Sequence, residues 1–317
     1  MATTTTEDPT VKAPGEVPHP ATGELKGQDL AERKFARKLI LPALITAILI
    51  TQVPFLVTIF YSFQDWNLAR PEERGFAGFD NYIAVVTNGA FLPALWATVW
   101  MVGLSMLLSM LLGLLFAILL DRKFPGQALA RTLLITPFLI MPAAAALIWK
   151  YSILDTDSGI ATLLLSWIGL DGVAWTTDFP GLTIVFTLTW QYTPFMMLIL
   201  LAGMQSISEE VREAVRVDGA TAWQEFRDIT LPHLSRFLQL GGLLGTVFIV
   251  QELDPIYMMT KGGPGNATTT LPYLVFRKAI EGSNVGLAAA VGVVVVVLAI
   301  IVITALLRTL DRAMRGI

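Results

Sequence analysis

Long apolar segments, separated by shorter charged ones, form the main pattern along this chain. Five segments contain no Asp, Glu, Lys or Arg: 39–64, 91–120, 132–149, 179–208 and 285–307. A helix needs about 20 apolar residues to cross the roughly 30 Å hydrocarbon layer of a bilayer, where the backbone polar groups can pair only within the helix. A sixth apolar segment is interrupted only by Glu252 and Asp254. The pattern therefore predicts six transmembrane helices, at about 39–64, 91–120, 132–150, 179–204, 237–259 and 285–307.

The composition agrees with a membrane protein and excludes several kinds of site. Of 317 residues, 54% are hydrophobic and only 15% are charged, against roughly 25% in a soluble domain. This balance predicts an all-α integral membrane fold with the lipid bilayer around it. The chain has no cysteine and only two histidines, so we expect no metal site and no catalytic residues. The net charge of −3 gives no reason to expect a nucleic-acid partner.

The charges in the loops predict how the helices are oriented. The loops on the side of the N-terminus hold most of the Lys and Arg residues, whereas the opposite loop around Asp155 and Asp171 is acidic. Basic loops stay in the cytoplasm, so we expect both termini to be cytoplasmic. Residues 1–35 contain no apolar stretch, and we expect them to form a disordered cytoplasmic tail before a transmembrane domain at 36–317.

The longest inner loop, at 205–236, has the pattern of ordered structure. Ser206 and Glu209 have the spacing of a capping box, which predicts a short helix over 209–218. Gly219 follows at the position where a left-handed C-terminal cap is needed, because glycine adopts a positive φ without strain.

A second short helix is expected directly after this turn. Thr221 is suited to cap it, with Gln224 three residues further on. We expect Pro232 to end this helix, because the residue before a proline resists the α conformation. One face of the helix is apolar: Ala222, Trp223, Phe226 and Ile229.

An ordered inner loop with an apolar face has two explanations. The two helices either pack back on their own bundle or on lipid, or they dock into a groove on a cytoplasmic partner. The pattern of residues alone leaves both explanations open.

The sequence of this loop resembles that of a known family. Its signature runs from Glu213 through Ala214, Asp218, Gly219 and Ala220, and continues with Ile229, Leu231 and Pro232. These residues resemble the EAA loop of ABC-importer permeases in order and in spacing, without a gap, and the one departure is Val215 in place of the second alanine. Four further pieces resemble the carbohydrate branch of that family, the maltose and glycerol-3-phosphate type: Gly78–Tyr82, Trp190–Phe195, Asp254–Tyr257 and Thr260–Ala267.

The resemblance implies a type I ABC importer permease in the inner membrane of a prokaryote. Such a chain pairs with a second homologous permease, and an extracytoplasmic solute-binding protein delivers the solute. Its EAA loop lies in a groove of a cytoplasmic ABC ATPase dimer, which holds the ATP and Mg²⁺, so the permease itself binds no cofactor. By this resemblance the coupling residues are Glu213, Ala214, Asp218, Gly219, Ala220, Ile229, Leu231 and Pro232.

Polar residues inside the apolar segments are the candidates for contact with the solute. Trp190, Gln191 and Tyr192 stand just before Pro194, which removes a backbone hydrogen bond and bends a helix. Aromatic rings with an amide suit a polyhydroxylated solute, although ordinary helix packing explains them equally well.

A second group of candidates lies near the end of the fifth segment: Gln251, Glu252 and Asp254. On a continuing helix the two carboxylates would point about 200° apart. They can share one path only if the helix ends first, which Pro255 favours. In that case Asp254 can also be a loop residue that faces water.

Two other functions fit parts of the pattern. A secondary carrier also has six or more spans, but it usually needs internal repeats and buried ion-coupling charges, of which Glu252 alone is a candidate. An ABC importer permease for a non-sugar solute shares the EAA loop but not the Gly-Gly-Pro-Gly piece at 262–265. No basic residue stands within the apolar segments themselves, so we expect a neutral sugar or polyol rather than a phosphate ester.

Overall fold

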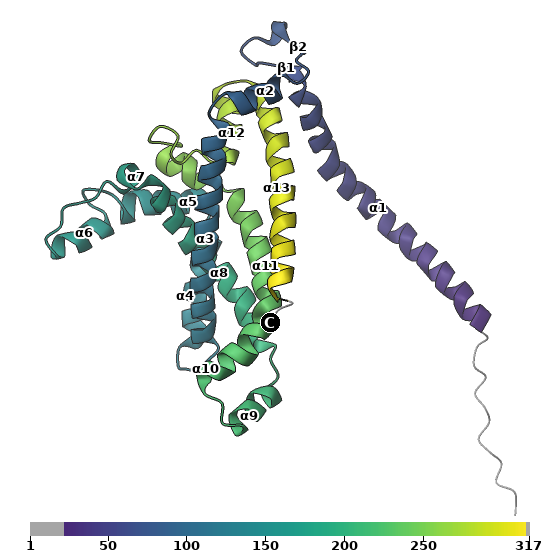
Figure 1. Cartoon of the computed structure of the whole chain (residues 1–317), viewed down its shortest axis with the longest axis vertical. Coiled ribbons are helices and arrows are strands. Elements are labelled where there is room, and N and C mark those ends of the chain that lie inside the picture. The colour runs from purple at the N-terminus through teal and green to yellow at the C-terminus, as the bar shows by residue number, and fades with distance from the viewer. Residues whose placement is uncertain (1–21, 315–317) are drawn as a thin grey trace, which may run out of the picture. The chain divides into compact units, whose positions relative to one another are not determined.

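The computed structural model describes residues 22–314, except for the side chains of 22–38, 216, 303, 305–307 and 309–314. The chain divides into two units, residues 1–56 and 57–317. Nearly all of the regular structure is helical (Figure 1). The α-helices are α1 Thr22–Ser62, α2 Asp80–Thr87, α3 Phe91–Leu120, α4 Gln127–Leu139, α5 Pro142–Ile148, α6 Ile160–Trp167, α7 Trp175–Asp178, α8 Pro180–Gln205, α9 Glu209–Val217, α10 Ala222–Glu225, α11 Leu231–Val250, α12 Leu271–Phe276 and α13 Val285–Met314.

Shorter elements complete the description. A two-stranded antiparallel sheet pairs β1 with β2, with Gln64 opposite Phe76. A 3₁₀ turn follows at Pro71–Glu73, and four π turns widen the helical path. The strands are β1 Gln64–Asp65 and β2 Gly75–Phe76, and the π turns are Trp149–Ile153, Phe226–Thr230, Ile256–Thr260 and Arg277–Glu281.

The number of predicted spans agrees with the structure. Within the described part of the chain, five helices are long and apolar enough to cross a membrane: Leu39–Ser62, Phe91–Leu120, Pro180–Gln205, Ala222–Val250 and Val285–Val302. A bent pair, Gln127–Leu139 with Pro142–Ile153, makes a sixth span if the pair is counted as one.

The expected disordered tail before the first span and the expected form of the third span need correction. Helix α1 begins at Thr22, inside the segment expected to be a disordered tail, because residues 24–38 are rich in helix formers such as Leu, Lys, Glu, Ala and Arg. The rest of that expected tail, 1–21, lies outside the described residues. The third span, predicted as one helix over 132–150, turns by 102° between Leu139 and Pro142. Pro142 begins the second arm, where its missing N–H costs no hydrogen bond.

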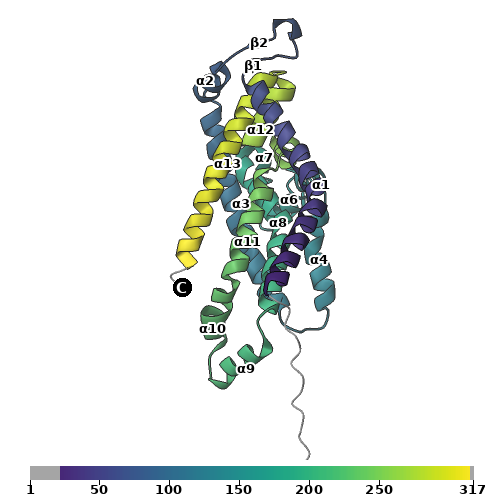
Figure 2. The same cartoon turned by 90° about the vertical axis from the view of Figure 1, so that its right-hand side faces the viewer.

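The fifth span also differs from the prediction, at both of its ends. Pro232 does not end the helix of the inner loop: α10 leads through the π turn Phe226–Thr230 directly into α11 (Figure 2). A π turn widens the helix by one residue, and such turns commonly accommodate a disturbance of the hydrogen-bond ladder, such as a proline. At the other end α11 stops at Val250, well before the expected residue 259.

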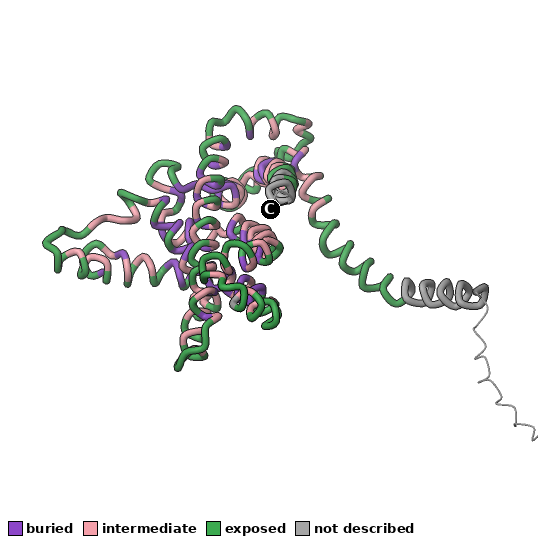
Figure 3. The backbone as a smooth tube through the Cα atoms, turned by 60° about the horizontal axis from the view of Figure 1, so that its bottom comes forward, coloured by how far each residue is buried: buried purple, intermediate pink, exposed green. Residues whose placement is uncertain are grey.

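The core of the second unit is built where α8 crosses its neighbours α3 and α11. Met196 of α8 is fully buried there. A Cβ on Gly113 of α3 would lie 2.5 Å from Met196 Cβ, and one on Gly245 of α11 would lie 1.9 Å from Met196 Cε. Only hydrogen fits at these two glycines, so the helices approach closely. Figure 3 shows the buried positions gathered within this unit.

At the end of the second unit opposite to α9, one asparagine joins two distant segments. Asn81 of α2 donates its Nδ2 hydrogens to the carbonyl oxygens of Ser62 (3.0 Å), the last residue of the first span, and Gln64 (2.9 Å). Gly286, in the first turn of α13, lies so close that a Cβ there would be 2.0 Å from Gln64 O and 3.1 Å from Asn81 Nδ2. Asn81, in the sequence Gly78–Tyr82, therefore fastens the end of the first span close to the start of the last one.

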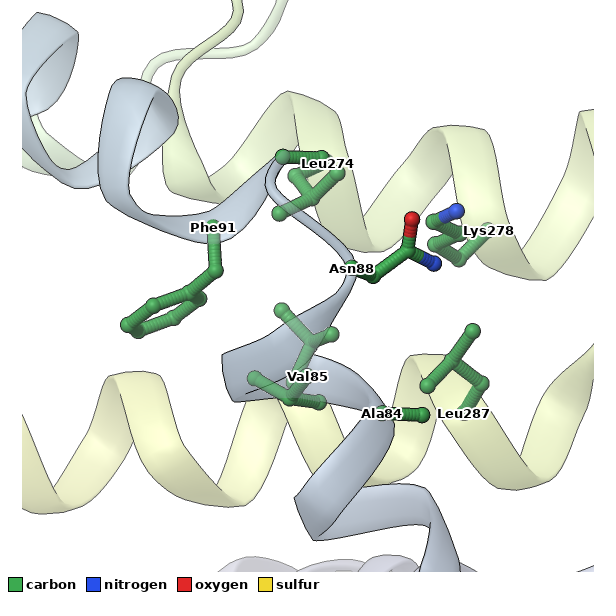
Figure 4. Close-up of a pocket in the computed structure, with 9 residues that line it drawn as sticks. Ala84, Val85, Asn88, Phe91, Leu274, Lys278 and Leu287 are labelled. Atoms are coloured by element: carbon green, nitrogen blue, oxygen red, sulfur yellow. The ribbon is translucent and has the colours of Figure 1, made fainter.

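The neighbouring part of α2 packs against α12 and α13 through apolar side chains. Val85 of α2, Phe91 of α3 and Leu274 of α12 converge there (Figure 4). They leave a void of only about 10 Å³. Since so little space remains, α2 is held in place by packing as well as by Asn81.

We expect Asn81→Ala to lower the free energy of unfolding by about 1–3 kcal/mol, because it leaves two carbonyl groups without their hydrogen-bond donor. Unfolding of the purified chain in lipid discs, followed by tryptophan fluorescence, measures this loss. Asn88→Ala is the matched control, since Asn88 is an exposed asparagine at the other end of the same helix. Equal stability of the two variants would contradict the role given to Asn81.

Candidate functional site

A cavity of about 300 Å³ lies where α11 ends beside α8. Four of the predicted solute contacts line it together with two residues that the sequence did not single out. The six lining residues are Tyr192, Phe248, Gln251, Glu252, Leu253 and Asp254. Pockets that hold a small ligand begin at about this volume.

The two carboxylates share this cavity because the helix ends in front of them. The last turn of α11 tightens: the N–H of Gln251 donates to Phe248 O (3.3 Å), and that of Glu252 donates to Ile249 O (3.2 Å). Such i to i+3 bonds are typical of the last turn of a helix. The 200° separation expected on a continuous helix therefore does not apply, and the early helix end that Pro255 favours is confirmed.

Aromatic rings form one side of the cavity and hold the polar groups in place. Tyr192 donates its hydroxyl hydrogen to Glu252 Oε1, which joins α8 to the segment after α11. Phe195 links the rings on either side of it, stacking on Phe138 at 5.4 Å and meeting Phe248 edge-on at 5.3 Å between ring centroids. Phe138 in turn meets Tyr192 at 6.1 Å. The cavity thus combines aromatic faces with hydrogen-bond acceptors.

Trp190 and Gln191, the other two predicted contacts, do not line this cavity. Gln191 donates an Nε2 hydrogen to the carbonyl of Ile140 (3.1 Å), at the bend between α4 and α5. The bend frees backbone groups inside the apolar layer, and a side chain of a neighbouring span satisfies one of them. Trp190 meets Trp149 edge-on, with ring centroids 6.0 Å apart. Successive residues on a helix point about 100° apart, so only Tyr192 of the three faces the cavity.

Phe248 and Leu253 were missed because nothing in the sequence marks an apolar residue as part of a site. Phe248 stands one helical turn before Glu252. This spacing would have placed Phe248 beside Glu252 if the end of α11 had been known.

The inner loop forms the predicted pair of short helices. Gly219 has a φ of +78°, as a left-handed cap requires. Thr221 and Gln224 make a capping box at the start of α10. Ser206, expected to form a capping box with Glu209, lies instead at the end of α8. Its hydroxyl donates to Gly203 O (2.7 Å) and lies 2.8 Å from His233 Nε2.

The loop with α9 and α10 lies at one end of the second unit, beyond the ends of α3 and α8 (Figure 1), and it exposes apolar side chains. Val217 is 86% exposed and Trp223 is 67% exposed. These side chains therefore do not pack back on their own bundle. Of the predicted coupling residues, Ala220, Ile229 and Pro232 are half-buried, and the rest are exposed: Glu213, Ala214, Asp218, Gly219 and Leu231.

Comparison with known proteins agrees with this architecture. The profile of a family described as binding-protein-dependent transport system inner membrane component matches residues 109–316. A probable ABC transporter permease protein of Sinorhizobium fredii is 33% identical over 274 residues, covering 86% of this chain and 88% of the relative. The trehalose transport system permease protein of Mycobacterium tuberculosis is 30% identical, covering 85% of this chain and 86% of the relative.

A solved structure shares the fold over most of the chain. The crystal structure of a bacterial ABC transporter that imports the acidic polysaccharide alginate contains a chain with a TM-score of 0.75 at 22% sequence identity, covering 90% of this chain and 98% of that one. The resemblance seen in the EAA loop is thereby confirmed. This chain is a multi-pass inner-membrane permease subunit and belongs to the family of binding-protein-dependent transport system inner membrane components.

Proposed function

We propose that this chain forms half of the translocation pathway of an ATP-driven importer for a neutral sugar or polyol. The observation that carries the proposal is the composition of the cavity at the end of α11. Tyr192 and Phe248 offer aromatic faces to the C–H groups of a sugar ring, while Gln251, Glu252 and Asp254 offer acceptors for its hydroxyl groups. The trehalose permease from Mycobacterium tuberculosis supports this class of solute.

The charge of the cavity separates neutral from anionic solutes. None of its six lining residues is basic, and two are carboxylates, Glu252 and Asp254. A phosphate ester would meet like charges there without a compensating cation among the lining residues, which disfavours its binding. A neutral polyhydroxylated solute meets no such barrier.

The inner loop is the proposed contact with the ATPase. Its exposed side chains Val217 and Trp223 offer an apolar surface on a short helical pair, which fits a groove on a partner. We place ATP and Mg²⁺ on a cytoplasmic ABC ATPase dimer, so this chain itself binds no cofactor. A second permease completes the pathway and an extracytoplasmic binding protein delivers the solute. Both termini of this chain are placed in the cytoplasm, on the side of the loop.

The complex that co-purifies with this chain, reconstituted in lipid discs with its binding protein, tests the proposal. We expect ATP hydrolysis to rise with one neutral sugar or polyol from a panel that also includes glycerol-3-phosphate, amino acids and peptides. Stimulation only by a solute of the latter kinds would reject the sugar class. A chain that purifies without an ATPase would reject the importer itself.

Within the same complex, we expect Glu252→Gln to lower the rate of sugar transport about tenfold or more. A hydrogen bond to a charged acceptor contributes about 1.5–3 kcal/mol, and the amide oxygen still accepts from Tyr192, so the fold is kept. Uptake of labelled sugar into proteoliposomes measures the rate. Glu73→Gln, in the exposed 3₁₀ turn, is the control. If the two variants transport equally well, Glu252 has no part in the pathway.

We further expect Gly219→Val to reduce transport while leaving the complex assembled. No atom outside its neighbours lies within 4 Å of a Cβ at this position, so the effect comes only from its φ of +78°. A left-handed backbone costs an L-residue about 1–2 kcal/mol, and more for a β-branched one, so the turn between α9 and α10 shifts. Gly219→Asn is the control, since asparagine tolerates this conformation. Normal transport by the valine variant would remove the turn from the coupling mechanism.

A further inference from the structure

Helix α9 is fastened to the membrane helices by one arginine. Arg212 Nη1 lies 2.8 Å from Asp121 Oδ2, and its Nη2 donates to the carbonyl oxygen of Met204 at 2.7 Å. Asp121 is the C-terminal cap of α3, and Met204 lies in the last turn of α8. A single guanidinium therefore contacts the inner ends of both helices, and its fixed fork is suited to two acceptors at once.

This ion pair is shielded from water, unlike the other two pairs among the described residues. The side chains of Arg212 and Asp121 are 19% and 12% exposed. In contrast, Arg70 and Glu73 are 62% and 58% exposed at a similar distance of 2.7 Å. The third pair, between the neighbours Arg227 and Asp228, is also exposed. Exposed pairs contribute little, whereas a shielded pair cannot lose one partner without leaving a charge in a poor solvent.

Most of the other α9 residues whose side chains the structure describes are exposed. Glu209, Glu210, Val211 and Glu213 are exposed, and Val217 projects away from the bundle. In contrast, α3 and α8 pack closely against each other, because Gly113 of α3 lies directly against Met196 of α8. A displacement of α9 therefore reaches the tightly packed pair α3 and α8 through Arg212.

We propose that Arg212 is a positioning residue for energy coupling: its forked contact carries the displacement of α9 to the inner ends of α3 and α8. This inference rests on the proposed function, since it supposes that the ATPase acts on α9. Beyond the proposed function, the inference names Arg212 as the residue through which the motion of α9 reaches the membrane helices.

The test is the number of sugar molecules transported per ATP hydrolysed, measured in proteoliposomes with the assembled complex. We expect Arg212→Ala to lower this ratio about fivefold or more, the lower range of energetic coupling between sites. Arg212→Lys reaches only one of the two acceptors and should give an intermediate ratio. Exchange of the charges, Arg212→Asp with Asp121→Arg, restores the pair but not the contact to Met204, so it should recover part of the ratio.

Arg70→Ala is the matched control, because it removes an exposed ion pair of similar length at the outer end. Its ratio should equal that of the unsubstituted complex. If Arg212→Ala prevents assembly, Arg212→Lys decides: an intermediate ratio supports the inference, and an unchanged ratio overturns it. An unchanged ratio in an assembled Arg212→Ala complex also overturns it. If the unsubstituted complex shows no sugar-stimulated ATP hydrolysis, the proposed function itself has failed, whatever the variants do.

Discussion

The close crossing of three helices at Met196 is the constraint on which the rest of the second unit depends. In a bilayer, burial of apolar surface does not drive helices together, because lipid is as apolar as a leucine side chain. Close packing must provide the attraction, and it needs residues without side chains at the crossing. Gly113 and Gly245 serve α3 and α11, and Gly203 serves α8, where Phe237 fills the space at 2.6 Å from a Cβ position. With these helices fixed, the positions of the cavity and of the inner loop follow.

The elements that the sequence predicted well depend on local or strongly periodic signals. Uncharged segments long enough to cross a bilayer gave the spans, and the turn at Gly219 followed from the conformational freedom of glycine. Thr221 with Gln224 formed the box that its spacing indicated. Each of these features is decided within a few residues, or by the bilayer itself.

The features that the sequence did not predict depend on neighbouring helices. The bend at Ile140 persists because Gln191, fifty-one positions away, satisfies the exposed carbonyl. The apparent polar cluster before Pro194 therefore divides, with Gln191 supporting a neighbouring span and Tyr192 facing the cavity. In the same way, Ser206 forms a hydrogen bond with His233 instead of capping α9, because α8 continues up to Gln205 and Ser206 follows it directly. Tertiary partners of this kind leave no trace in local spacing.

The π turn before Pro232 has a consequence for insertions and deletions in this region. Because α10, the π turn and α11 form one continuous helix, every residue from Ala222 to Val250 has a fixed angular position on it. Adding or removing one residue between Thr221 and Pro232 would rotate the whole of α11 by about 100° relative to the loop. Gly245 would then turn away from Met196, and Phe248 would leave the cavity. The length of this short stretch thus sets the rotational register of a membrane helix. At about 1.5 Å of rise per residue, a deletion there would change side-chain positions some 30 Å away.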